Sequence, residues 1–187
     1  MHSLEEKLVE RRTVYCGKIL TVNVDRVSLP DGMQATREVV LHAGAAAIVA
    51  VDDSGDVLLV EQYRYAVGSA LLEIPAGKMD AGEDPMECAR RELGEEAGVK
   101  ARNWEMLGSF FTSPGFSSEV IHVFMATGLE PVDPGEARAD DDELLRVLRV
   151  PLAGVRDLIT SGLVRDAKTV AGLLLALEPV PGREKGT

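Results

Sequence analysis

One segment, residues 77–99, predicts a capped helix between two loops; it reads G-K-M-D-A-G-E-D-P-M-E-C-A-R-R-E-L-G-E-E-A-G-V. Asp84 suits the N-cap, Pro85 the first helical position, and Gly98 a left-handed residue that ends the helix. Gly77 precedes the helix in a loop whose backbone can approach a ligand closely. Apolar residues recur at the helical period and should face the core: Met86, Ala89, Leu93 and Ala97.

Three carboxylates gather on the last turns of this helix: Glu92, Glu95 and Glu96. Positions three or four residues apart are neighbours, so the acids share one side, near the negative end of the helix dipole. Each like-charge pair should cost about 0.2–0.5 kcal/mol on an exposed helix. A cation reverses that cost, and oxygen ligands at this density favour Mg²⁺ or Mn²⁺ over zinc. Arg91 can hold the acids in place by pairing with Glu87 and Glu95.

Length and charge limit the classes of partner. With 187 residues, one domain or one domain with a small extension is expected. The net charge of −11 argues against nucleic acid or an anionic membrane as a partner, and an anionic substrate would need a metal ion to enter. No apolar stretch has transmembrane length, and the two cysteines form neither a disulfide framework nor a zinc pattern, so we expect a cytoplasmic protein.

The chain divides into zones of different pattern. Residues 13–42 alternate polar and apolar side chains around a turn at Pro30-Asp31-Gly32, which predicts an antiparallel hairpin or a small antiparallel sheet. Strand-like runs then flank the helix without a βαβ rhythm, so a mixed sheet with helices packed on it is expected. Leu152–Ser161 and Ala167–Glu178 predict two more helices. The expected division is a β subdomain, an α/β (α+β) domain and a disordered tail: residues 1–42, 43–178 and 179–187.

The helical segment resembles the Nudix box, in which a glycine and a glutamate precede R-E-aliphatic-x-E-E-x-G-aliphatic at fixed spacing. A solvated acidic helix is the alternative, but it does not account for the cap and the two glycines. The resemblance implies an α/β/α sandwich over roughly residues 43–150 and hydrolysis of a nucleoside diphosphate linked to another moiety. Every fixed position is filled, by Gly77, Glu83, Arg91, Glu92, Leu93, Glu95, Glu96, Gly98 and Val99.

The same resemblance implies a metal-binding set. Glu92 and Glu96 should be direct ligands, and Glu95 a further ligand or a partner of the ligands. Family members also bind metal through the backbone carbonyl before the box glycine, which is Ala76 here. About two or three ions, Mg²⁺ or Mn²⁺, are implied together with the substrate. Glu83 is expected to orient the loop or the box arginine rather than to touch substrate.

Residues around the box resemble the ADP-ribose pyrophosphatase group. Pro114 lies 15 residues after Val99, where that group carries a proline, although a simple strand terminator is the alternative. Residues 72–77 read L-E-I-P-A-G and residues 61–64 read E-Q-Y-R, as in that group. The strands before the box resemble its dimerising subdomain, so a homodimer is implied.

This resemblance also assigns substrate contacts. Arg64 would bind the diphosphate or ribose, because a guanidinium suits phosphate oxygens, with a structural salt bridge as the alternative. Glu73 would join the metal or substrate network or cap backbone, and Glu119 would approach the site or begin an exposed strand. The expected substrate-binding residues are Arg64, Glu73, Pro114, Gly115 and Glu119.

The general base is expected on an acidic loop after the box, where group members carry a D-E-x-E-like stretch. Here that stretch is Asp140-Asp141-Asp142-Glu143, so an aspartate replaces the first glutamate. Glu143 is the first candidate, Asp141 is its competitor, and Glu95 completes the catalytic set. A merely solvated loop is the alternative, and the glycine and proline of this loop are compatible with a lid.

Three functions remain open for such a chain. The first is Mg²⁺-dependent hydrolysis of ADP-ribose to AMP and ribose 5-phosphate. The second is the same chemistry on another sugar nucleotide, such as GDP-mannose. The third is a Nudix module that senses a nucleotide without turning it over, which the intact acids Glu92, Glu95 and Glu96 argue against.

Overall fold

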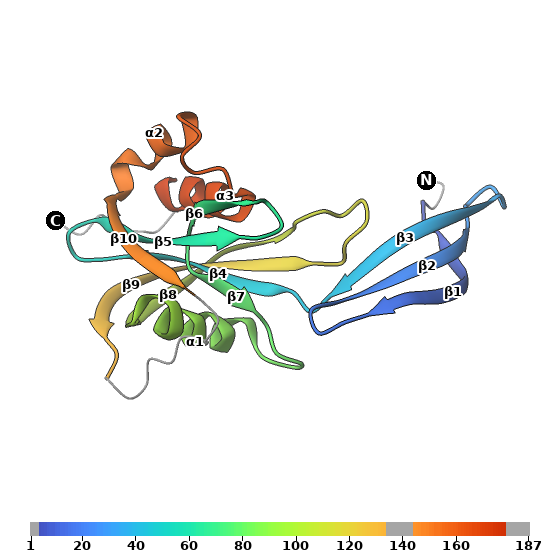
Figure 1. Ribbon diagram of the computed structural model, residues 1–187, viewed down its shortest axis with the longest axis horizontal. Coiled ribbons are helices and arrows are strands. Elements are labelled where there is room, and N and C mark those ends of the chain that lie inside the picture. Colours follow the sequence, from blue (N-terminus) through green and yellow to red (C-terminus); the bar gives the residue numbers. More distant parts are fainter. Residues whose placement is uncertain (1–3, 134–143, 179–187) are drawn as a thin grey trace. The chain divides into compact units, whose positions relative to one another are not determined.

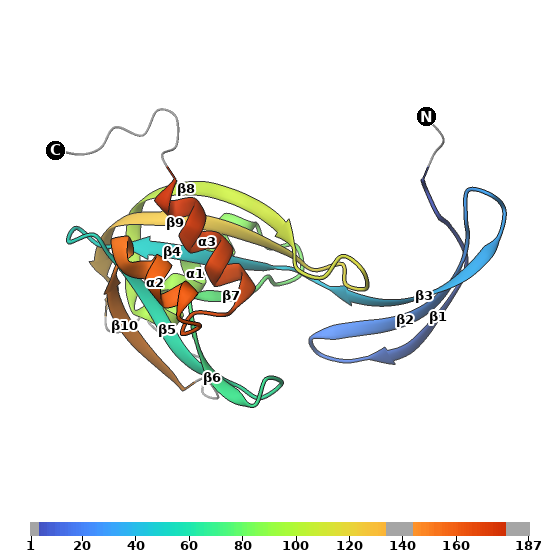
Figure 2. The same ribbon diagram turned by 90° about the horizontal axis from the view of Figure 1, so that it is seen from above.

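The computed structural model describes residues 4–133 and 144–178, and the chain forms two compact units. The first unit comprises Met1–Gly44 and Phe110–Val120, and the second comprises Ala45–Ser109 and Ile121–Thr187. The elements of both units are labelled in Figures 1 and 2. Within the described ranges, no helix has the length and apolar character that spanning a bilayer requires.

The first unit contains a three-stranded antiparallel sheet, which confirms the small sheet expected from the sequence. The turn between its second and third strands forms at Asp31 and Gly32. Gly32 has φ 86°, and Asp31 Oδ1 accepts a hydrogen bond from the backbone N–H of Met33 at 3.0 Å. In spatial order, the strands are β1 (Lys7–Cys16), β2 (Leu20–Ser28) and β3 (Gln34–His42).

Strand β2 buries polar side chains, whereas β1 is exposed along its whole length. Asp25 accepts hydrogen bonds from Arg11 Nε at 3.0 Å and from Nη2 at 2.7 Å, and Asn23 accepts one from Thr13 Oγ1 at 2.8 Å. The hydrogen bonds from Arg11 lower the pKa of Asp25. These pairs satisfy the buried polar groups of β2 from its neighbour β1.

The second unit is built around a seven-stranded mixed sheet, as the sequence predicted. Its main path runs β10-β5-β4-β9-β8, with β6 paired to β5 and β7 paired to β4. β4 and β9 are parallel, while β5 pairs antiparallel with β6 and with β10. These strands are β4 (Ala45–Val51), β5 (Asp56–Arg64), β6 (Ser69–Glu73), β7 (Ala76–Lys78), β8 (Val99–Phe111), β9 (Val120–Pro131) and β10 (Leu145–Pro151).

Helices cover both faces of this sheet (Figures 1 and 2). Strand β4 is apolar throughout, and its side chains alternate between two buried cores. Val49 packs in a cluster with Leu173, whereas Ile48 packs with Leu93 on the other face. This is the expected α/β/α sandwich. Its helices are α1 (Pro85–Ala97) on one face and α2 (Val155–Thr160) and α3 (Ala167–Leu177) on the other.

The helix expected over Leu152–Ser161 divides into two elements. Leu152–Gly154 forms a 3₁₀ turn, η1, and α2 follows it. Gly154 is a weak helix former, and the regular α-helix begins directly after it. The second expected helix, α3, ends within one residue of its predicted boundary.

Candidate active site

Helix α1 turns two of its acids toward the sheet. At its N-cap, Asp84 accepts a hydrogen bond from the backbone N–H of Met86 at 2.8 Å, and Gly98 ends the helix with φ 66°. The residues Glu92 and Glu96 are only 8% and 7% exposed. Glutamates are almost never this buried without compensating partners. The carboxylates of this pair therefore belong to a buried polar site rather than to a solvated helix face.

Arg91 holds three carboxylates at once. Its Nε donates to Glu83 Oε1 at 3.0 Å, and its Nη1 donates to Glu92 Oε1 at 2.6 Å and to Glu95 Oε2 at 2.9 Å. The hydrogen bond to Glu83 and the charge of Glu92 raise the pKa of Arg91, and Arg91 lowers the pKa of Glu83. The pairing of Arg91 with Glu95 and the orienting role of Glu83 follow the sequence expectation.

The expected pair between Arg91 and Glu87 is wrong. Glu87 Oε1 instead lies 3.6 Å from Arg90 Nε on the exposed side of the helix. Arg91 reaches back over the loop, where it bonds to Glu83 and where its Nη2 donates to the carbonyl of Lys78 at 3.2 Å. The guanidinium therefore ties the helix to the preceding loop.

The backbone of Ala76 and Gly77 lies against both buried acids. Glu96 Oε2 accepts a hydrogen bond from the N–H of Ala76 at 2.8 Å. The Glu92 carboxylate occupies the place that a Cβ on residue 77 would need. Cys88 Sγ lies 3.7 Å from the carbonyl oxygen of Gly77, to which it donates. Pairing of β7 with β4 fixes this segment from its other side.

These donors suit a hard divalent cation. Two buried carboxylates, those of Glu92 and Glu96, meet the backbone of Ala76 and Gly77, and oxygen donors of this kind favour Mg²⁺ or Mn²⁺. In residues 4–133 and 144–178, no three His, Cys, Asp or Glu side chains surround one metal position. Glu95 is held by Arg91 instead. The residues present fit a divalent ion, with a carboxylate pair and backbone as the nearest donors.

A second charged cluster lies where β6 ends. Glu73 is 1% exposed and accepts hydrogen bonds from Arg64 Nε at 2.9 Å and Nη2 at 2.8 Å, and Lys168 Nζ pairs with the same carboxylate. Burial alone would raise the pKa of Glu73, but hydrogen bonds from Arg64 and Lys168 outweigh burial and lower it. The hydrogen bond to Glu73 raises the pKa of Arg64, and the charge of Glu96 adds to this rise. Of the acids of α1, Glu96 therefore acts on the charge of this cluster.

For Arg64 and Glu73, the structure decides part of what the sequence left open. The salt bridge named as the alternative for Arg64 is present, and Glu73 bonds to two cations rather than to backbone. Their contact with a substrate remains a prediction. Lys168 was not anticipated, because R-D-A-K-T signals only a helix start at Asp166. The residues around Asp166 do not indicate that the start of this helix faces β6.

Three of the expected substrate-binding residues belong to the first unit: Pro114, Gly115 and Glu119. Their loop is joined to β3, where Val40 N–H donates to the Phe116 carbonyl at 2.7 Å. Glu119 accepts a hydrogen bond from Thr112 Oγ1 at 2.6 Å and lies 3.4 Å from His42 Nδ1. The candidate bases, Asp141 and Glu143, lie outside the described residues.

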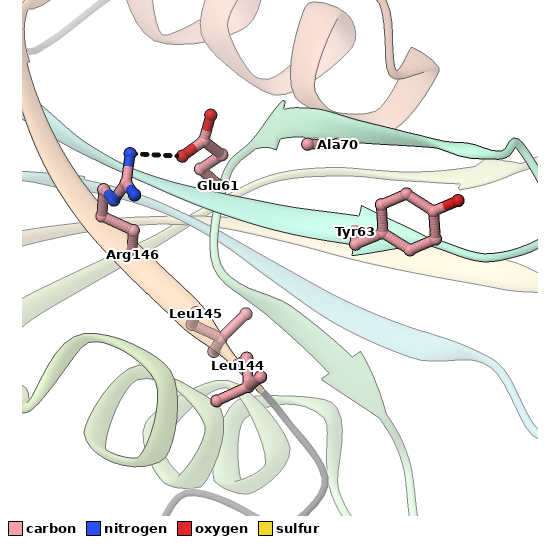
Figure 3. Close-up of a pocket in the computed structure, with 6 residues that line it drawn as sticks. All are labelled: Glu61, Tyr63, Ala70, Leu144, Leu145 and Arg146. Carbon is pink, nitrogen blue, oxygen red and sulfur yellow. Dashed lines mark ion pairs between the residues drawn. The ribbon is translucent and has the colours of Figure 1, made fainter.

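A shallow cavity of about 430 Å³ lies along β5, β6 and β10 (Figure 3). Glu61 and Arg146 form an ion pair at 3.0 Å on one side of it, and Tyr63 presents its ring on the other. None of the described acids of α1 lines this cavity, so we assign the chemistry to the carboxylate pair and not to the cavity. The remaining lining residues are Ala70, Leu144 and Leu145.

Comparisons with known proteins identify two domains in this chain. The model of the NUDIX domain matches residues 41–172, and the model of the nucleoside diphosphate sugar hydrolase N-terminal domain matches residues 6–40. An ADP-ribose pyrophosphatase of Bacillus subtilis (strain 168) is 41% identical over 90% of this chain and 91% of its own length. A methanol dehydrogenase activator of Bacillus methanolicus is 39% identical over 89% of each chain.

A solved structure gives the same picture in three dimensions. The crystal structure of an ADP compounds hydrolase superposes with a TM-score of 0.81 at 27% identity, over 93% of this chain and 94% of the other. The agreement therefore covers both the N-terminal sheet and the sandwich that carries the acids. On these matches, the chain belongs to the Nudix family of hydrolases, with a nucleoside diphosphate sugar hydrolase N-terminal domain ahead of its Nudix domain.

Proposed function

We propose that this protein hydrolyses the diphosphate bond of ADP-ribose to AMP and ribose 5-phosphate with Mg²⁺. The observation that carries the proposal is the buried carboxylate pair, Glu92 and Glu96, held against the backbone of Ala76 and Gly77. Similarity to an ADP-ribose pyrophosphatase over nine-tenths of the chain supports ADP-ribose as the substrate.

The metal would be held by Glu92, Glu96 and the carbonyl of Ala76, and by Glu95 once Arg91 releases it. Nudix hydrolases generally use divalent metal ions, and we propose Mg²⁺ or Mn²⁺, about two or three per site. When bound, such ions neutralise charge on the phosphoryl oxygens and lower the pKa of water. Arg91 keeps the acids together beforehand, because its hydrogen bonds to Glu92 and Glu95 offset their mutual repulsion.

Arg64 is proposed to bind the substrate diphosphate. Its bonds to Glu73 use Nε and Nη2, which fixes the plane of the guanidinium on an almost fully buried carboxylate. A fixed planar donor suits phosphate oxygens. Pro114, Gly115 and Glu119 are proposed to contact the rest of the substrate.

Water is proposed to be activated by Glu143, with Asp141 as the competing base. We expect Glu143→Gln to lower kcat more than Asp141→Asn, because a carboxylate that accepts the proton of water contributes about 10²–10⁴-fold. Rates measured at saturating substrate rank the two variants. The reverse ranking would move the base to Asp141.

We also propose a homodimer that forms through the first unit, in the cytoplasm. Supporting this, the exposed strand β1 and the turn after it carry large apolar side chains that monomers usually bury: Leu8, Val9, Val14, Tyr15 and Ile19. Asp25 and Asn23, which are buried beneath β1, accept its hydrogen bonds, so this edge strand is firmly attached.

A substrate screen tests the activity. ADP-ribose, GDP-mannose and NADH are incubated separately with Mg²⁺, and release of AMP or GMP is measured by chromatography. We expect ADP-ribose to give the highest kcat/KM, with AMP and ribose 5-phosphate in equal amounts. A higher kcat/KM on GDP-mannose than on ADP-ribose would make GDP-mannose the substrate in place of ADP-ribose. No turnover of any diphosphate, together with tight binding of ADP-ribose, would make the protein a sensor.

The metal assignment is tested by Glu96→Gln. This variant keeps an oxygen that can accept from Ala76 N–H but loses the charge, so kcat should fall by about 100-fold or more while the fold persists. Glu87→Gln is the matched control, because Glu87 is an exposed acid on the same helix. Wild-type kcat in Glu96→Gln would remove Glu96 from the metal-binding set.

A further inference from the structure

The start of α3 is a compact polar cluster outside the box. Asp166 caps the helix: its Oδ2 accepts hydrogen bonds from Thr169 N–H at 3.0 Å, from Thr169 Oγ1 at 2.6 Å and from Lys168 Nζ at 2.9 Å. Thr169 is 0% exposed. One aspartate thus orients both the threonine hydroxyl and the lysine ammonium, and both side chains extend toward the end of β6.

Thr169 fixes the backbone that leads to the candidate metal site. Its Oγ1 donates to Asp166 and accepts a hydrogen bond from the backbone N–H of Ile74 at 3.0 Å, 95 residues away in the chain. A hydroxyl has one donor, so Asp166 sets the direction in which Oγ1 can accept. Ile74 is 0% exposed, and its N–H would lose a buried partner without this hydroxyl.

The residues after Ile74 are anchored one after another. The carbonyl of Pro75 accepts from the N–H of Ile48 at 2.8 Å, and the N–H of Ala76 donates to Glu96 at 2.8 Å. Thr169 therefore anchors one end of the short segment Ile74–Ala76, and Glu96 anchors its other end. Only Pro75 lies between Ile74 and Ala76, and its carbonyl is itself bonded to Ile48, so we expect a displacement at Ile74 to shift Ala76.

Lys168 helps to neutralise the carboxylate of Glu73, the residue before Ile74. This carboxylate pairs with both Lys168 and Arg64, and the Lys168 side chain is only 13% exposed. Without Lys168, Arg64 would be the only described cation paired with a carboxylate that is almost fully buried. Arg64 alone would then neutralise Glu73, so less of its positive charge would be left to attract a phosphate.

We propose that Lys168 and Thr169 are positioning residues for the hydrolysis: Thr169 places the Ala76 carbonyl through Ile74, and Lys168 keeps Arg64 available to the diphosphate by sharing Glu73. The inference deepens the proposed function and rests on it for the identity of the diphosphate. Through these two residues, helix α3 would contribute to both metal binding and substrate binding.

Thr169 is tested by metal binding without substrate. Mn²⁺ is titrated calorimetrically into wild type, Thr169→Val and Thr169→Ser. We expect Thr169→Val to bind Mn²⁺ about tenfold more weakly, which corresponds to about 1.4 kcal/mol, and Thr169→Ser to restore the wild-type affinity. If Thr169→Val does not fold, Thr169→Cys replaces it, because a thiol accepts hydrogen bonds only weakly.

Lys168 is tested by the division between KM and kcat. In Lys168→Met, KM for ADP-ribose should rise about tenfold with kcat changed less than threefold, because binding of the diphosphate is what Arg64 contributes. Lys168→Arg should restore most of the affinity. Lys100→Met is the control, since Lys100 is an exposed lysine of the same unit. Thermal unfolding of each variant separates loss of folded protein from loss of binding.

The outcomes are distinguishable. Wild-type Mn²⁺ affinity in Thr169→Val and wild-type KM in Lys168→Met, with only a lower Tm, would reduce both residues to structural roles and overturn the proposal. If wild type does not cleave ADP-ribose but Thr169→Val still loses Mn²⁺ affinity, the proposed substrate fails while the role of Thr169 stands.

Discussion

The backbone of residue 77 approaches the Glu92 carboxylate so closely that a Cβ there would overlap it. This contact, rather than an unusual backbone angle, explains the glycine at the start of the box. A side chain at this position would push Glu92 away from Ala76 and Gly77. The close approach thereby joins a loop residue and a helix residue into one candidate site.

Gly77→Ala should therefore abolish most activity without unfolding the protein. We expect kcat/KM to fall about 100-fold, because Glu92 is displaced by its clash with the new methyl group. Steady-state kinetics and calorimetric Mn²⁺ binding measure the effect. Gly154→Ala is the control, since no atom lies within 4 Å of a Cβ there and φ is −92°. Unchanged Mn²⁺ affinity in Gly77→Ala would contradict the assignment of Glu92.

The two thiols should differ sharply in reactivity. Burial, with the charges of Glu83 and Glu92, raises the pKa of Cys88 to about 12, whereas Cys16 is exposed. Near pH 8, about one Cys88 in ten thousand is a thiolate. A chromogenic disulfide reagent should label one thiol in the native protein and two in guanidinium, and Cys16→Ser should remove the native label. Rapid native labelling in Cys16→Ser would show that Cys88 is accessible.

At the scale of elements, the N-cap of α1 is a local hydrogen bond that the sequence alone predicts. Asp84→Ala should lower the free energy of unfolding by about 1 kcal/mol, because the hydrogen bond to Met86 N–H is lost. Urea denaturation measures the change, and Asp53→Ala, an exposed aspartate, should leave stability unchanged. Equal stability of Asp84→Ala and wild type would show that the cap contributes nothing.

Strand β4 and the segment Leu152–Ser161 show how much of an element its own sequence pattern predicts. The continuous apolar run of β4, A-A-A-I-V-A-V, is typical of a strand covered on both faces, and the structure places alternate residues in the two cores. The mixed apolar and polar pattern over Leu152–Ser161 predicts one helix, yet a 3₁₀ turn comes first. Periodicity detects the apolar side of a segment better than the point at which the regular helix begins.

For the whole molecule, the exposed apolar residues of β1 predict a dimer. Light scattering should give twice the chain mass of 20.1 kDa for wild type. Replacing Leu8 and Tyr15 together by glutamate should give the single-chain mass, because charges oppose burial at an interface. Met106→Glu is the control, since Met106 is an exposed apolar residue of the second unit. A wild-type monomer at micromolar concentration would refute the prediction.

The sequence by itself determined the capped helix, the acids on it and the strand-forming segments of both sheets, because each follows from residues close together in the chain. It also indicated Arg64 and Glu73, but not that these two bind each other. Only the tertiary structure decided that Glu92 lies against Gly77 and that Thr169 bonds to Ile74, 95 residues away. Contacts of that kind depend on how α1 and α3 pack on opposite faces of one sheet, and no local pattern encodes that packing.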